Sequence, residues 1–108
     1  MVLPEEIGDA AQDADEADVA RVKAWLDSGG DINDGDEYNY TLLHCCAIGT
    51  REDSEVTDAH VSLARTLIAL GADVNIAMHV GATPLYIACQ EGHVDVVRVL
   101  SGLRADVN

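Results

Sequence analysis

The sequence contains no phenylalanine, and its aromatic side chains are limited to one tryptophan and three tyrosines among 108 residues. Hydrophobic residues still make up 48% of the chain, a fraction typical of folded proteins. The apolar packing therefore has to come from alanine, valine, leucine and isoleucine. Side chains of this size favour thin packed layers over one large aromatic cluster. We expect a single domain with such a layered core.

Basic residues are also scarce, because six lysines and arginines face 20 aspartates and glutamates, for a formal net charge of −14. This charge repels nucleic-acid backbones and anionic membrane surfaces, so neither is expected as a partner. Twelve of the 20 acidic residues precede residue 38, where Arg21 and Lys23 are the only bases. A protein with a basic surface would be attracted to this half of the chain.

Long hydrophobic runs are missing as well, and none approaches the roughly 20 apolar residues of a membrane span. The opening segment "MVLPEEIG" lacks the basic and apolar regions of a signal peptide. Three cysteines, two of them adjacent, do not make a disulfide framework. These absences predict an intracellular, cytoplasmic protein, with a nuclear location as the alternative. We expect a monomer.

One five-residue phrase occurs three times, as "GGDIN" at 29–33, "GADVN" at 71–75 and "RADVN" at 104–108. The last two copies are 33 residues apart, and the first two are 42 apart. Self-similarity of this kind indicates an architecture of stacked repeats. The phrases divide the chain into units of about 4–33, 34–75 and 76–108.

The last unit carries clear helix signals. Gly81 suits a left-handed turn, Thr83 can cap a helix through its hydroxyl, and Pro84 fits the first helical position. Apolar spacing predicts two helices separated by a break at Gly92. The first is expected to bury Leu85, Ala88 and Cys89, and the second Val96, Val97, Val99 and Leu100.

The segments "GATPLYIAC" at 81–89 and "NYTLLHCCA" at 39–47 follow the same pattern, and the chain resembles the ankyrin repeat family. The resemblance implies an all-α solenoid of stacked helix-turn-helix units with short β-hairpin loops. It covers essentially the whole chain and is weakest at the start of unit 4–33, which has the acidic surface of a capping repeat. Because the chain stops within a hairpin, we expect it to be a fragment of a longer protein.

The middle unit is longer than the last one. Thr41 precedes Asn75 by 34 positions, whereas Thr83 precedes Asn108 by 25, so nine extra residues lie within 49–60. This stretch has four acidic residues, one arginine and few apolar side chains. We interpret it as a solvated insertion that costs little to close. The alternative is a loop that makes an extra contact.

Metal and catalytic sites are not expected. The "HCC" run at 44–46 invites a zinc hypothesis, with His60 as a further ligand. The repeat register instead places Cys46 and Cys89 where small apolar residues pack, and the resemblance makes His44 a structural hydrogen bonder. The sequence contains no phosphate-binding loop, nucleophile elbow or catalytic triad order. We therefore expect no cofactor and no enzymatic activity.

The resemblance implies a non-catalytic module that binds a partner protein through its hairpin tips and the concave face of the first helices. Tyr38 and Tyr40 are the strongest candidates, since large amphipathic rings anchor interfaces; packing against the neighbouring hairpin is the alternative. Two other functions stay open, an architectural spacer for a neighbouring domain and a substrate of an asparaginyl hydroxylase at Asn75. The full set of partner-binding candidates is Glu37, Tyr38, Tyr40, His79, Val80, Ala82, Gln90 and Glu91.

Overall fold

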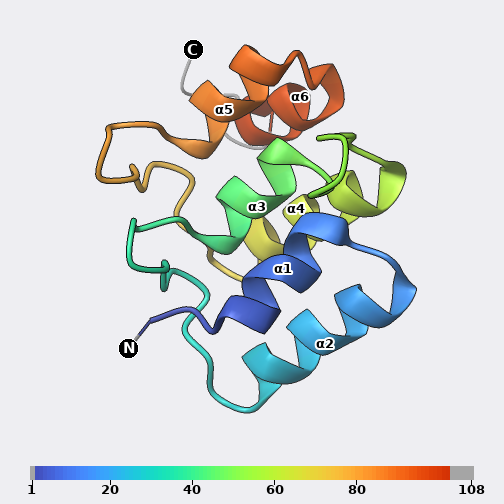
Figure 1. Ribbon diagram of the computed structural model, residues 1–108, viewed down its shortest axis with the longest axis vertical. Helices are drawn as coiled ribbons and strands as arrows, with labels where there is room; N and C mark the ends of the chain where they lie inside the picture. Colours follow the sequence, from blue (N-terminus) through green and yellow to red (C-terminus); the bar gives the residue numbers. More distant parts are fainter. Residues whose placement is uncertain (1, 103–108) are drawn as a thin grey trace.

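The computed structural model describes residues 2–102 and consists of three consecutive pairs of helices (Figure 1). The first helices of the three pairs pack side by side and form the inner layer. The second helices form the outer layer behind them. This arrangement confirms the predicted all-α stack of helix pairs. The third copy of the repeated phrase, residues 104–108, lies outside the described residues. The helices are α1 (Glu5–Asp13), α2 (Glu16–Asp27), α3 (Leu42–Ile48), α4 (Asp58–Ala69), α5 (Pro84–Glu91) and α6 (Val94–Gly102).

The first helices of the second and third repeats, α3 and α5, begin by the same local rule. Thr41 and His44 form a capping box at α3, and the Thr83 hydroxyl accepts a hydrogen bond from the Tyr86 amide at α5. Pro84 occupies the first turn of α5, as predicted. Gly81 has a φ of 93°, so the left-handed turn expected there is confirmed. Between residues 2 and 102 the loops form one isolated antiparallel bridge, Gly35 with Thr41, and no longer strand.

The core is built from small aliphatic side chains, as the missing phenylalanines require. Leu42 of α3 and Leu67 of α4 are fully buried, and Val22 and Val96 continue the same layer into the first and third repeats. Trp25 is only half-buried at the edge of this core. Such a core divides into interfaces between neighbouring repeats, and each repeat depends on the next for its burial.

Two side chains of α5 do not lie where the sequence predicted. Leu85 is 37% exposed and Cys89 is also exposed, whereas their counterparts in α3, Leu43 and Ala47, are buried. The physical reason is that α3 packs between α1 and α5, while α5 has a described inner-layer neighbour on one side only. Ala88 is buried as predicted. In α6, Val96, Val99 and Leu100 are buried as predicted, and Val97 is half-buried.

Histidines join the repeats through backbone carbonyls. His44 Nε2 lies 2.9 Å from the Ala82 oxygen in the third repeat, and His60 Nε2 lies 2.6 Å from the Gln12 oxygen in the first. His93 contacts two carbonyls, since Nδ1 is 2.7 Å from the Ala47 oxygen and Nε2 is 2.8 Å from the Ser54 oxygen. The structural role expected for His44 is therefore confirmed, and His60 and His93 have the same role.

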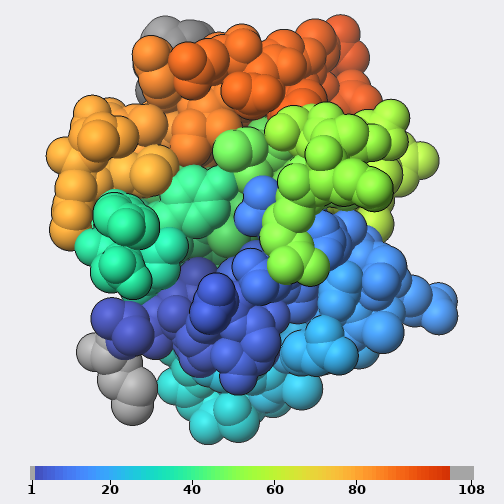
Figure 2. Space-filling view, in the orientation of Figure 1, coloured from blue at the N-terminus to red at the C-terminus, as the bar shows by residue number. Residues whose placement is uncertain are grey.

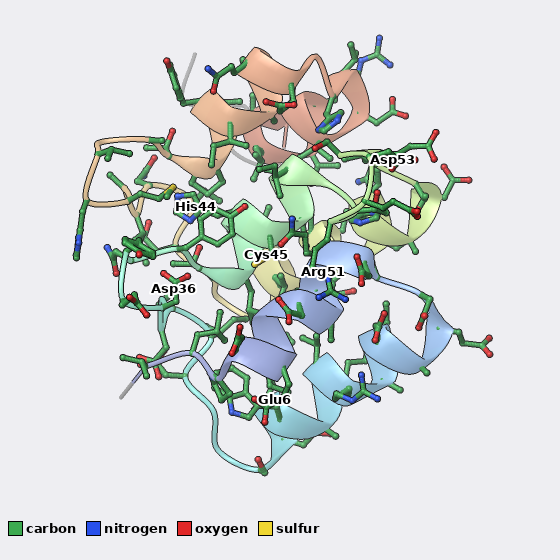
Figure 3. The ribbon with its side chains drawn as sticks, in the orientation of Figure 1. Glu6, Asp36, His44, Cys45, Arg51 and Asp53 are labelled. Carbon is green, nitrogen blue, oxygen red and sulfur yellow. The ribbon has the colours of Figure 1, made fainter. Side chains whose placement is uncertain are left out.

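The insertion contacts the rest of the molecule instead of extending freely into solvent. It covers residues 49–57, because α4 already begins at Asp58. Arg51 reaches toward α1 (Figure 3), where it pairs with Asp13 at 2.6 Å and with Asp9 at 3.2 Å. Since the Ser54 carbonyl also faces His93, the insertion links the first and third repeats. The loop is solvated as predicted, because residues 51–53, 55 and 57 are exposed, and it also makes these contacts within the molecule.

Candidate partner-binding surface

The two hairpin tips of the described chain lie side by side (Figure 2, teal and orange). The His79 amide donates a hydrogen bond to the Tyr38 carbonyl at 3.0 Å. The Asn39 side-chain amide donates to the Ala77 carbonyl at 2.9 Å. These two bonds hold the segments 36–40 and 77–82 together, so the tips present one continuous surface.

Large side chains on this surface are exposed to solvent and do not pack in the core. Tyr38 is 59% exposed and Val80 is 84% exposed. Glu37 and His79 are exposed beside them. An aromatic ring and an aliphatic side chain on a rigid backbone can be buried by a partner with little loss of conformational entropy.

Tyr40 differs from Tyr38 and belongs largely to the structure. Its ring is half-buried and stacks on His44, with the ring centroids 5.4 Å apart. Burial raises the pKa of the Tyr40 phenol, so the phenol is neutral at neutral pH. Tyr40 therefore packs against a side chain of its own repeat, and its part in partner binding stays a prediction.

Asp36 sets the shape of the first tip. One of its carboxylate oxygens, Oδ1, accepts hydrogen bonds from the amides of Tyr38 at 2.8 Å and Tyr40 at 3.0 Å. This is the local side-chain-to-backbone bonding that aspartate favours in turns. The carboxylate therefore directs the two aromatic residues, one toward solvent and the other toward α3.

His44 supports the same tip from below, and its protonation state follows from its partners. The Thr41 amide donates to Nδ1 at 3.0 Å, so the ring proton lies on Nε2 and is donated to the Ala82 carbonyl. Burial lowers the pKa of His44, which agrees with a neutral ring. Ala82 is half-buried and contributes its backbone to the tip more than its methyl group.

The remaining predicted residues, Gln90 and Glu91, are exposed on the last turn of α5, at the opposite end of that helix from the tip. The sequence analysis missed Tyr86, which is 58% exposed on the first turn of α5. Tyr86 occupies the position in the third repeat that His44 has in the second, and its backbone amide donates to the Thr83 hydroxyl at the start of α5. The substitution of tyrosine for histidine was the signal that could have identified it.

A groove of about 510 Å³ lies between the N-terminal segment, α1 and the first tip. We call it the N-terminal groove. Sequence reasoning did not find it, because its residues are up to 43 positions apart and meet only in the folded chain. Its lining consists of Val2, Leu3, Pro4, Glu5, Gly8, Asp9, Gln12, Asp36, Glu37, Tyr38, Tyr40 and Cys45.

The cysteines do not form a reactive centre. Cys45 and Cys46 are both buried, and burial raises the pKa of Cys46 to about 12, so this thiol stays protonated and unreactive. Cys89 is exposed on α5, contrary to the expected packing position. Within residues 2–102, no three histidine, cysteine or acidic side chains are placed to hold a metal ion.

Asn75, the predicted modification site, lies in the exposed loop after α4. Its amide donates to the Asp73 carboxylate at 2.8 Å, which fixes the backbone of the turn. Modification of Asn75 stays a prediction.

None of the helices in the described part of the chain is long and apolar enough to cross a membrane. A family model described as ankyrin repeats matches residues 9–108 in three copies. Three curated relatives are palmitoyltransferases by name. Hip14 of Drosophila melanogaster is 35% identical over 82% of this chain and 13% of its own length. Human ZDHHC17 and human ZDHHC13 are each 33% identical over 80% of this chain and 12% of their own length.

Proposed function

The chain belongs to the ankyrin repeat family, and from this premise we propose that it binds one partner protein through its two joined hairpin tips and the adjoining concave face. Ankyrin repeats bind protein partners and are generally non-catalytic. The proposal is carried by one observation, the pair of exposed side chains Tyr38 and Val80 on tips that are hydrogen-bonded to each other. A rigid surface of this kind binds without first having to be ordered.

The charge of the chain supports a partner with a basic surface. The formal net charge is −14, and the acidic residues are concentrated in the first repeat and the first tip. Complementary charge mainly raises the association rate and selects among partners, while apolar and aromatic contacts supply most of the affinity. We propose that the tips provide those contacts, and that the protein acts as a monomer in the cytoplasm.

An architectural role is the second candidate, and the relatives favour it. The chain spans only 12–13% of the length of the palmitoyltransferases it matches. In proteins of that size, a repeat module can position a catalytic region without binding a separate partner. We propose that acyl transfer belongs to other parts of those relatives, since ankyrin repeats are generally non-catalytic.

The two roles are separated by variants of the tips. A partner is first recovered with the isolated 108-residue chain, and its affinity is then measured for Tyr38→Ala combined with Val80→Ser. We expect the dissociation constant to rise about tenfold or more, because exposed anchors are lost while the core is untouched. Leu70→Ser is the matched control, since Leu70 is 60% exposed on the outer layer.

Two other outcomes would contradict binding through the tips. If the double variant and Leu70→Ser bind the recovered protein alike, the tips are not the binding surface. If no protein is retained above the level of a denatured sample, the spacer role is favoured.

A further inference from the structure

The N-terminal groove has a preformed shape. The Leu3 amide donates to the Gly35 carbonyl at 2.9 Å, so the N-terminal segment is held against the base of the first tip. The floor contains Leu3 and Cys45, which are 4% and 2% exposed, and the exposed ring of Tyr38 lies on the tip side. The groove has a volume of about 510 Å³ and is open to solvent, so a side chain of another protein can enter it.

The charge in this groove has one sign. Four carboxylates line it, and none of its lining residues is lysine, arginine or histidine. Two of the carboxylates already have partners, because Asp9 pairs with Arg51 and one oxygen of Asp36 accepts hydrogen bonds from backbone amides. The other two, Glu5 and Glu37, form no ion pair within residues 2–102. Burial raises the pKa of both Tyr40 and Cys45, so the floor is neutral. An acidic rim over a neutral floor complements a cation on an aliphatic stem.

Gly8 supplies an independent observation. It lies inside α1, where glycine is less favourable than alanine, and its φ is not positive. A Cβ at this position would be 3.4 Å from Leu3 Cδ2 and 3.9 Å from Cys45 Sγ, which are ordinary contacts. Neither the backbone nor the packing therefore requires glycine here. Its effect is to leave the floor of the N-terminal groove open.

We propose that the N-terminal groove binds an arginine side chain from an extended segment of the partner protein. This inference rests on the proposed function and assigns it a specific contact. The guanidinium group lies between the Glu5 and Glu37 carboxylates and against the face of Tyr38, and the methylene groups lie over Leu3 and Gly8. Arginine is favoured over lysine because its planar group both stacks on an aromatic ring and bonds to carboxylates in pairs.

The test uses small probes and the complete chain labelled with ¹⁵N. Nα-acetylarginine amide is titrated into the protein while amide chemical shifts are followed by NMR. The matched probe is Nα-acetylcitrulline amide, which has nearly the same shape and no charge. We expect the arginine shifts to cluster at Gly8, Glu37, Tyr38 and Cys45, with an affinity about fivefold higher than that of citrulline.

Two variants connect these shifts to the groove. Gly8→Leu fills the floor and is expected to weaken arginine binding about tenfold. Glu37→Gln removes one rim charge and should weaken it about threefold, whereas Glu16→Gln, the same change at the exposed start of α2, should have no effect. Glu37→Gln keeps the test decisive if Gly8→Leu does not fold, because Glu37 is exposed and outside the core.

Shifts spread over the acidic surface, or equal losses in Glu37→Gln and Glu16→Gln, would overturn the groove as a specific site. Equal binding of Nα-acetyllysine amide would overturn the preference for a guanidinium group. A partner protein weakened by Val80→Ser but not by Gly8→Leu would overturn the groove while leaving the proposed function intact. If arginine binds in the groove but the tip variants leave the binding of a partner unchanged, the groove site is supported and the proposed function is overturned.

Discussion

The ring of His93 bridges the third repeat to Ser54 of the insertion, with 2.8 Å between Nε2 and the carbonyl oxygen. The other ring nitrogen, Nδ1, faces the Ala47 carbonyl at 2.7 Å. Because carbonyl oxygens only accept, both contacts are hydrogen bonds only when both ring nitrogens carry protons. One side chain thus ties together α3, the insertion and the start of α6.

Removing this bridge is expected to destabilise the protein. His93→Ala leaves two partly buried carbonyls without their partner, and we expect the free energy of unfolding to fall by about 1–3 kcal/mol. Urea denaturation measures the loss. His79→Ala is the control and should change stability by less than about 0.5 kcal/mol, because His79 is exposed at a tip. Equal effects of the two changes would contradict the bridge.

The outer layer provides a matched pair of leucines. Leu67 is fully buried and Leu70, three residues later, is 60% exposed. Leu67→Ala should lower the free energy of unfolding by about 2–5 kcal/mol, because it leaves a cavity between repeats. Leu70→Ala should cost less than about 0.5 kcal/mol. Chemical denaturation of both variants checks the register of α4, and the reverse order would refute it.

The two tyrosines of the first tip should differ in their effect on the free energy of unfolding, measured by chemical denaturation. Tyr40→Ala removes the stacking on His44 and should cost about 1–2 kcal/mol of stability. Tyr38→Ala should cost less than about 0.5 kcal/mol, because its ring is mostly in solvent. A large loss of stability on Tyr38→Ala would mean that this ring packs against the fold and is not available to a partner.

Gly8→Ala should stabilise the chain, in contrast to most glycine substitutions. The added methyl group has room, and alanine in a helix interior is favoured by about 0.5–1 kcal/mol. Gly30→Ala is the opposite case, since a Cβ there would be 2.4 Å from the Trp25 ring. Thermal unfolding of both variants distinguishes them. If Gly8→Ala destabilises the chain, the packing of α1 requires glycine at this position, and the open floor of the groove does not explain it.

Acid should weaken the fold through His44. Burial holds the pKa of His44 below its ordinary value of 6.5 in the folded chain, so the unfolded chain binds this proton more readily. The stabilising contribution is complete above pH 6.5 and is lost as the pH falls through the lower folded value. NMR titration of the His44 ring should give a midpoint below 6.5. A midpoint above it would contradict a neutral ring bonded to Ala82.

The periodic and local features of the fold were determined by the sequence itself. The repeat period, the caps at Thr41 and Thr83, and the first-turn Pro84 are read from neighbouring residues, because caps and turns depend on contacts within about four positions. The layered aliphatic core likewise followed from the absence of phenylalanine. Leu85 and Cys89 were misplaced because a repeat pattern assumes a neighbour on both sides.

Only the tertiary structure decided which surface residues are available. Tyr38 and Tyr40 are equivalent by pattern, yet the carboxylate of Asp36 and the ring of His44 direct them to opposite environments. The N-terminal groove and the bridge from His93 to Ser54 join segments about 40 positions apart. Contacts at that separation depend on how the repeats stack, and periodicity along the chain carries no information about them.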